Sequence, residues 1–203
     1  MIEPRIYLAS RSPRRRELLT QIGVRFDLLL FRAGAREDAE VSEDWLPGEA
    51  PDDYVVRVAR AKAAFGADLL KRRPLVAHPV LAADTTLDVD GEVIAKPADA
   101  EHAEAILARL SGRGHRVLTA VALAHGEHLA HRVSVSEVRF RTLSAEEIRR
   151  YVRSGEPMDK AGAYGIQGSA AVFVEEIRGS HSGIVGLPLC ETALLLREFG
   201  YPI

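Results

Sequence analysis

An apolar run at residues 6–9 opens the chain, and a second apolar run follows at 24–31. Runs of this length are typical of strands. The stretch between them predicts a helix that ends near Gly23, because Ser12 is a favoured N-cap and Pro13 suits the first helical position. The chain is therefore expected to begin as strand, helix, strand.

Apolar positions that recur three and four residues apart predict three further helices. One begins at Pro51, with acidic residues in its first turn. The next is capped by Asp99 and ends at the helix-stop signal Ser111-Gly112. The third begins at Ser144 and Glu147, which have the spacing of a capping box.

Alternating apolar and polar positions predict the remaining strands. Asp90-Gly91 is a strong signal for a hairpin turn. The stretches 115–124 and 129–141 predict an antiparallel pair with these side chains opposite one another: Val117, Thr119, Val121 and Leu123 against Val133, Val135 and Val138. A strand at 171–178 and a helix through Phe199 complete the order.

This mixed order of elements predicts an α/β fold with a mixed sheet and a cleft, rather than a regular doubly wound parallel sheet. The 203 residues are enough for one substantial domain, and we expect 1–203 to form a single domain. The sequence contains no glycine-rich dinucleotide motif, Walker A motif or G-x-S-x-G motif.

Composition restricts the class of protein. A formal net charge of −2 offers no general attraction to nucleic acid, so a nucleic-acid partner is not expected. The single cysteine, Cys190, excludes an intrachain disulfide and fits a reducing compartment. The first residues do not resemble a signal peptide, and no apolar run is long enough to cross a membrane. We therefore expect a cytoplasmic protein without a membrane partner.

Asp84 is the most informative polar residue, because it ends the apolar run 80–83. A buried carboxylate is costly unless it has a partner. That partner could be a metal ion, a water molecule or a lysine, and the Asp90-Gly91 hairpin returns Lys96 toward Asp84. We interpret Asp84 as the reactive centre.

Three arginines, Arg14, Arg15 and Arg16, lie in the first turn of the first helix, where the helix dipole already disfavours cations. The cluster is either a solvated basic turn or an anion site where Ser10, the arginines and free N–H groups meet a phosphate. We favour the anion site, because a cation cluster directly after a strand is otherwise unexplained.

Three more features leave alternatives open. Lys62 lies on the apolar face of the second helix, either as a rim residue or as a phosphate ligand. The acidic stretch 32–50 is either a solvated loop or brings a carboxylate, above all Glu37, near a metal ion. The segment 155–168 contains four glycines and is either a demanding turn or the wall of a planar ligand, with Gln167 reading a base edge.

Together these segments resemble the Maf proteins. The similarity covers nearly the whole chain in the family's order, and several ordered motifs are more specific than any one alone. The motifs that carry it are Ala9–Leu19, Tyr54–Ala63, Ala83–Thr85, Lys96–Pro97, Leu110–His115, Asp159–Gly168 and Gly186–Leu189.

The resemblance implies a nucleoside triphosphate pyrophosphatase that cuts between the α and β phosphates with a divalent metal, Mg²⁺ or Mn²⁺. It implies a twisted, elongated sheet flanked by helices, with two lobes around a central cleft, as in inosine triphosphatases, and a homodimer. In the family the aspartate matching Asp84 is the proton acceptor. The positions matching Arg14, Thr85 and Gln167 set base preference in the family. Arginine, threonine and glutamine at these positions resemble the branch that acts on dTTP and UTP.

These positions suggest a mechanism. Asp84 deprotonates or orients a water molecule, as a general base, as a metal ligand together with Glu37, or as both. The charge that develops on the phosphates is stabilised by the cations Arg15, Lys62 and Lys96. The Ser10 hydroxyl holds the phosphate tail.

The alternative function is a non-catalytic regulator of septation that binds a nucleotide or a nucleic acid. The net charge disfavours a large nucleic-acid surface. A binder would also have no use for Asp84, which repels phosphate unless a metal intervenes. We therefore expect an enzyme.

Overall fold

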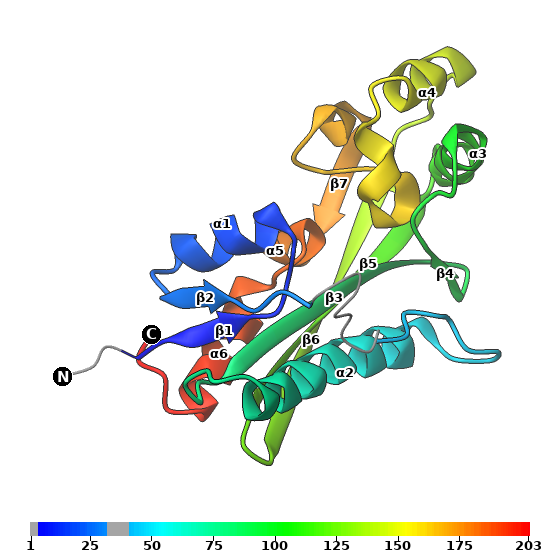
Figure 1. Ribbon diagram of the computed structural model, residues 1–203. Coiled ribbons are helices and arrows are strands. Elements are labelled where there is room, and N and C mark those ends of the chain that lie inside the picture. Colours follow the sequence, from blue (N-terminus) through cyan, green and yellow to red (C-terminus); the bar gives the residue numbers. More distant parts are fainter. Residues whose placement is uncertain (1–3, 32–40) are drawn as a thin grey trace.

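The computed structural model of this protein describes residues 4–31 and 41–203. Within them a seven-stranded mixed sheet runs through the molecule in the order β2-β1-β3-β5-β6-β7, with β4 paired to β3 (Figure 1). Strands β2, β1 and β3 are parallel neighbours, whereas the other pairings are antiparallel. The strands are β1 (Ile6–Leu8), β2 (Phe26–Leu28), β3 (Val80–Val89), β4 (Glu92–Ile94), β5 (Gly114–His125), β6 (His128–Phe140) and β7 (Val174–Arg178). The predicted mixed α/β fold is confirmed.

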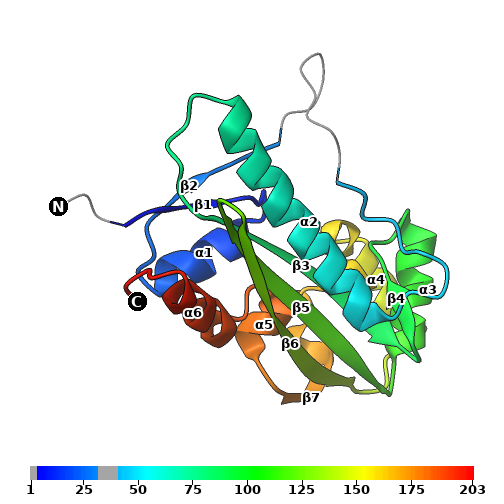
Figure 2. The same ribbon diagram turned by 90° about the horizontal axis from the view of Figure 1, so that it is seen from below.

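One face of the sheet is covered by the long helix α2 (Pro51–Arg72), as Figure 2 shows. Its buried stripe packs against the even-numbered residues of β3 and β5, including Val80, Ala82 and Ala120. The predicted start at Pro51 is confirmed. Because strand residues alternate between faces, Asp84 of β3 also points toward α2.

The opposite face of the sheet carries two separate hydrophobic clusters. Helices α1 (Pro13–Gln21) and α6 (Leu189–Glu198) pack on Leu81 and Ala83 at one end of β3. Helices α3 (Ala100–Leu110) and α4 (Ala145–Val152) pack on Leu87 and Val89 at the other end (Figure 1). Thr85 lies on β3 between the two clusters and belongs to neither. This gap between two lobes positions the candidate site.

Local sequence signals predicted the caps and the hairpin correctly. Asp99 accepts a hydrogen bond from the backbone of the first turn of α3, and Ser144 and Glu147 form the capping box of α4. Asp90 and Gly91 have φ angles of 58° and 85°, which a two-residue hairpin turn of this type requires.

The predicted pairing of the two longest strands was wrong in part. Thr119 lies opposite Ser134, whereas Val133 and Val135 lie opposite Ala120 and Leu118 on the other face of the sheet. Neighbouring side chains point to opposite faces, so an error of one residue moves a whole set of side chains across the sheet.

Two predicted strands are shorter than expected, and one helix was not predicted. Strand β2 covers only Phe26–Leu28, and β7 begins at Val174 because residues 169–173 form a 3₁₀ turn. The short helix α5 (His181–Val185) precedes α6 and follows a Ser180 cap. A five-residue helix is too short to have a clear apolar period.

Candidate active site

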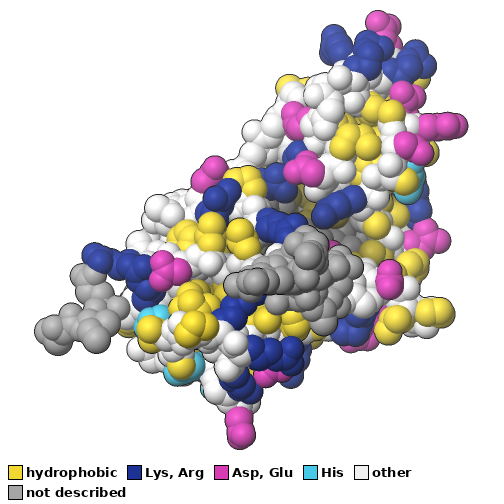
Figure 3. Space-filling view, in the orientation of Figure 1, with side chains coloured by type: hydrophobic (Ala, Val, Ile, Leu, Met, Phe, Trp, Pro, Cys, Tyr) yellow, Lys and Arg dark blue, Asp and Glu magenta, His cyan; other side chains and the backbone are white. Residues whose placement is uncertain are grey.

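A cleft of about 1330 Å³ lies between the two lobes. Its walls come from the start of α1, the middle of β3, residues 41–44, Lys96, the segment 156–168 and the end of α5. In the space-filling view, Lys and Arg side chains gather around the middle of the face shown (Figure 3). A cleft with basic walls attracts anionic ligands.

Asp84 sits in this cleft with a lysine as its partner. Lys62 of α2 donates from Nζ to Asp84 Oδ1 at 2.8 Å, and both side chains are at least 85 % buried. The same ammonium lies 2.6 Å from Glu43 Oε1, on the segment that precedes α2. Two carboxylates therefore converge on one cation, which offsets the cost of burying Asp84; the Glu43 side chain remains about half exposed.

Lys96 lines the same cleft but is exposed, and the described ion pairs of Asp84 do not include it. The prediction that the hairpin supplies the lysine partner of Asp84 is therefore corrected to Lys62. Burial alone would raise the pKa of Glu43, but the charge and hydrogen bond of Lys62, followed by the charge of Lys96, lower it. Lys96 therefore acts on Glu43 through its charge.

Arg15 crosses from α1 to the floor of the cleft. Its Nε donates to the carbonyl of Gly186 at 2.7 Å, and its guanidinium donates to Thr85 Oγ1 at 3.2 Å. Thr85 Oγ1 also lies 2.9 Å from Thr119 Oγ1, which donates to the carbonyl of Gly183. Burial lowers the pKa of Arg15, although the charge of Asp84 opposes this shift. The guanidinium is thus held in place beneath the cleft.

The start of α1 forms the wall beside Arg15. Ser12 caps the helix by accepting from the backbone of Arg15, and Pro13 follows, as predicted. Ser10 is 9 % exposed, and its hydroxyl accepts from the backbone of Ser12 at 3.1 Å. Arg14 lies on the same wall, 4.0 Å from Asp159 across the cleft.

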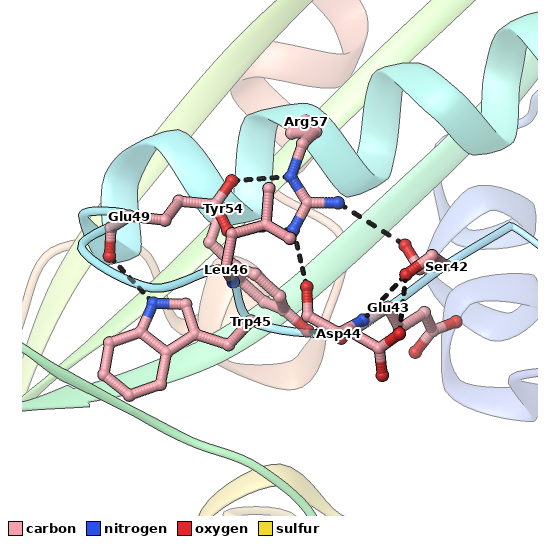
Figure 4. A network of polar contacts seen from close by, with 8 residues as sticks. All are labelled: Ser42, Glu43, Asp44, Trp45, Leu46, Glu49, Tyr54 and Arg57. Carbon is pink, nitrogen blue, oxygen red and sulfur yellow. Dashed lines mark hydrogen bonds and ion pairs between the residues drawn. The ribbon is translucent and has the colours of Figure 1, made fainter.

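The segment that carries Glu43 is clamped onto α2 by Arg57 (Figure 4). The Arg57 guanidinium contacts both carboxylate oxygens of Glu49, at 2.5 and 2.8 Å, and donates to the carbonyl of Asp44 at 2.7 Å. Tyr54 donates to the carbonyl of Glu43 at 2.9 Å. Arg57 also donates to the carbonyl of Ser42 at 3.5 Å, so the backbone is held on both sides of Glu43 and its carboxylate is directed toward Lys62.

Gln167 lies in the glycine-rich segment at the opposite wall. Its side chain is exposed and lines the cleft, on a tight turn closed by a hydrogen bond from Gly168 N to the carbonyl of Gly165 at 2.9 Å. The predicted irregular backbone is confirmed, because this part of the chain consists of short 3₁₀ turns.

Comparison with known proteins decides the family. Residues 5–199 match the family described as Maf-like protein. The chain belongs to the Maf-like family. It is 63% identical over 203 residues to the "dTTP/UTP pyrophosphatase" of Aromatoleum aromaticum, covering 100% of this chain and 98% of that protein. It is 59% identical over 197 residues to the protein of that name from Dechloromonas aromatica, covering 97% and 98%.

Among solved structures, the Staphylococcus aureus Ham1 protein matches with a TM-score of 0.45 and 15% identity, covering 67% of this chain and 71% of that one. Among the described residues, no helix of this Maf-like protein is both long and apolar enough to cross a membrane.

Most of the predicted site residues of this Maf-like protein line one cleft: Ser10, Arg14, Arg15, Lys62, Asp84, Thr85, Lys96 and Gln167. Their roles stay predictions. Glu37, predicted as a metal ligand, lies outside the described residues.

A divalent metal suits the donors present in the cleft. Mg²⁺ is usually held by one or two carboxylates, with water and substrate phosphates as the other ligands. Asp84 and Glu43 present such a pair, because both reach the same ammonium of Lys62. Among the described residues no group of three or more His, Cys, Asp or Glu side chains gathers as a closed metal cage. The pair therefore fits a metal that is bound together with a phosphate ligand.

The sequence favours Glu37 over Glu43 as the acidic residue near the metal, yet Glu43 is the one that the described residues place beside Lys62. A signal was available in the Pro47-Gly48 dipeptide, which is typical of a turn. The turn is present, because Glu49 N donates to the carbonyl of Leu46 at 3.0 Å. It reverses the chain, so that the residues before the turn lie alongside α2. The rotation of Glu43 toward Lys62 still depends on the clamp by Arg57.

Proposed function

We propose that this protein hydrolyses dTTP and UTP to the nucleoside monophosphate and pyrophosphate. The relatives that are 59–63% identical over nearly its whole length are named for this activity. The structural observation that carries the proposal is the buried Asp84 carboxylate, held by Lys62 inside a cleft with basic walls. A carboxylate in such a place suits water activation better than simple phosphate binding.

In this proposal the oxygen of a water molecule attacks the α-phosphorus. Asp84 accepts the proton of that water, the bond from the α-phosphorus to the bridging oxygen breaks, and pyrophosphate leaves. Lys62 holds the Asp84 carboxylate in a fixed orientation, which a general base requires.

A divalent cation, Mg²⁺ or Mn²⁺, is part of the proposal. Asp84 and Glu43 would hold it, and Glu37 stays a further predicted ligand. When bound, such an ion supplies positive charge to the phosphates and lowers the pKa of a bound water. Arg57 and Tyr54 would contribute by keeping the Glu43 backbone in place.

Binding of the substrate is divided between the two lobes. Ser10 and the start of α1 hold the phosphates, and three cations stabilise the charge that develops on them: Arg15, Lys62 and Lys96. Arg14, Thr85 and Gln167 face the same cleft and select the base. A homodimer in the cytoplasm stays a prediction.

The test is a panel of nucleoside triphosphates with Mg²⁺, in which pyrophosphate, inorganic phosphate and monophosphate are each measured. Pyrophosphate and monophosphate in equal amounts from UTP and dTTP, with other bases slower, is the expected result. Release of inorganic phosphate instead would contradict cleavage at the α-phosphorus. Nucleotide binding without any product would favour the non-catalytic regulator.

A further inference from the structure

A half-buried carboxylate, Glu156, holds the turn that carries Gln167 and lines the same cleft. Glu156 Oε2 accepts from Ser169 N at 3.1 Å and from Ser169 Oγ at 2.6 Å, two residues after Gln167. Glu156 Oε1 accepts from the Tyr151 hydroxyl at 3.0 Å. That hydroxyl in turn accepts from Gly165 N at 3.2 Å, two residues before Gln167. Glu156 and Tyr151, which are bonded to each other, therefore hold the turn on both sides of Gln167.

Close packing adds to these hydrogen bonds. A Cβ atom on Gly168 would overlap the Glu156 carboxylate, so only glycine permits this approach of backbone to carboxylate. Burial alone would raise the pKa of Glu156, but the hydrogen bonds from Ser169 and Tyr151 lower it. Glu156 is therefore ionised when it accepts these bonds, and charge-assisted hydrogen bonds are the stronger kind.

We propose that Glu156 is a positioning residue for base selection, which acts by fixing the turn on which Gln167 meets the pyrimidine. This inference rests on the proposed function, in which Gln167 contacts the base. Glu156 acts through the backbone of the turn and through Tyr151.

Discrimination between uracil and cytosine is the property that depends most on this support. Uracil presents a carbonyl and an N–H group on the edge where cytosine presents an amino group and an unprotonated nitrogen. A primary amide carries both a carbonyl and an NH₂ group, so Gln167 can match either base by rotating. The turn fixes the backbone of Gln167, and therefore the position from which its amide reaches the base, so loosening the turn should weaken the contact with the preferred base.

The experiment compares Glu156→Gln with the wild type on UTP and CTP. The variant keeps the size of the side chain but places an NH₂ group against donors. We expect the ratio of kcat/KM for UTP over that for CTP to fall at least about tenfold, because a misplacement of about 1 Å can cost about a hundredfold. The loss should fall mainly on KM for UTP, since Asp84 and Lys62 are unchanged.

The matched control is Glu147→Gln. Glu147 accepts equally many hydrogen bonds, from Arg141 and Ser144, but at the start of α4 and outside the cleft. It should lower thermal stability and leave the ratio of UTP to CTP unchanged. An equal loss of selectivity in both variants would show that Glu156 has a merely structural role and would overturn the inference.

Tyr151→Phe provides a second test if Glu156→Gln does not fold. It keeps the buried ring and removes the hydroxyl that joins Glu156 to Gly165 N, so selectivity should fall in the same direction. The dissociation constants of UTP and CTP, measured by titration without metal, test selection by binding alone. Wild-type protein that binds UTP selectively but releases no pyrophosphate would contradict the proposed function, whereas unchanged selectivity in both variants would contradict the role of Glu156.

Discussion

Lys62 Nζ lies 2.8 Å from Asp84 Oδ1, although the two residues are 22 positions apart and belong to a helix and a strand. Lys62 lies on the same face of α2 as the buried residues Val55, Val58 and Ala59. That face covers the side of β3 to which Asp84 points. The pair therefore forms at the place where the apolar helix–sheet contact meets the cleft.

The first prediction concerns Asp84→Asn, which keeps the shape of the side chain but removes the proton acceptor. We expect kcat for pyrophosphate release to fall about 10²–10⁴-fold, because this is the usual contribution of a general base. Folding and nucleotide binding should persist, as measured by circular dichroism and by titration with UTP. Normal turnover in this variant would exclude Asp84 as the reactive group.

Asp88→Asn is the control for this variant. Asp88 lies on the same face of the same strand, and its side chain is 6 % exposed and paired with Arg116 at 2.8 Å. It lines a different pocket. Its replacement should lower stability without changing kcat.

The second prediction concerns Arg57→Ala, which removes the clamp between α2 and the segment that carries Glu43. We expect the concentration of Mg²⁺ needed for half-maximal activity to rise about 10-fold or more, since residues that support metal ligands typically have effects of about 10–100-fold. Initial rates at several Mg²⁺ concentrations measure this change.

Arg60→Ala serves as the comparison for Arg57→Ala. Arg60 lies one turn further along α2 and contacts His131 rather than the cleft. An equal Mg²⁺ requirement in wild type and in both variants would show that the clamp does not support a metal ligand.

The third prediction concerns Gly168→Ala, which forces a Cβ atom into the Glu156 carboxylate. The carboxylate must then move away from Ser169 and Tyr151, and the loss of these hydrogen bonds should lower the free energy of unfolding by about 1–3 kcal/mol, measured by urea denaturation. Gly114→Ala is the matched substitution, because a Cβ there would meet nothing within 4 Å. Equal stability of the two variants would contradict the tight contact between Gly168 and Glu156.

The fourth prediction concerns the pH dependence of stability. The hydrogen bond from Arg141, followed by the bonds from Ser144, lowers the pKa of Glu147 from 4.5 to about 2. A carboxyl group whose pKa is lower in the folded state stabilises that state above the unfolded pKa. The contribution should therefore be complete above pH 4.5 and be lost as the pH falls toward about 2.

Thermal melting of the wild type and of Glu147→Gln at several pH values measures this contribution. The two melting temperatures should differ most near neutral pH and converge in acid. A difference that stays constant down to the lowest pH would contradict the lowered pKa of Glu147.

Local signals in the sequence determined much of the fold. Ser12, Asp99 and Ser144 cap helices as expected, and Asp90-Gly91 forms the expected hairpin, because a cap or a tight turn depends on a few neighbouring residues. The apolar stripe of α2 also placed Lys62 on the inward face. Asp84 was recognised for a similar reason, since a carboxylate that follows an apolar run requires a partner, although the strand continues to Val89.

The tertiary structure alone decided which groups meet. The identity of the partner of Asp84, Lys62 rather than Lys96, depends on how α2 is rotated over the sheet. The approach of Glu43 depends on the Arg57 clamp, and the support of Gln167 depends on Glu156. Such contacts join segments far apart in the chain, and their energies depend on register and packing that no local pattern specifies.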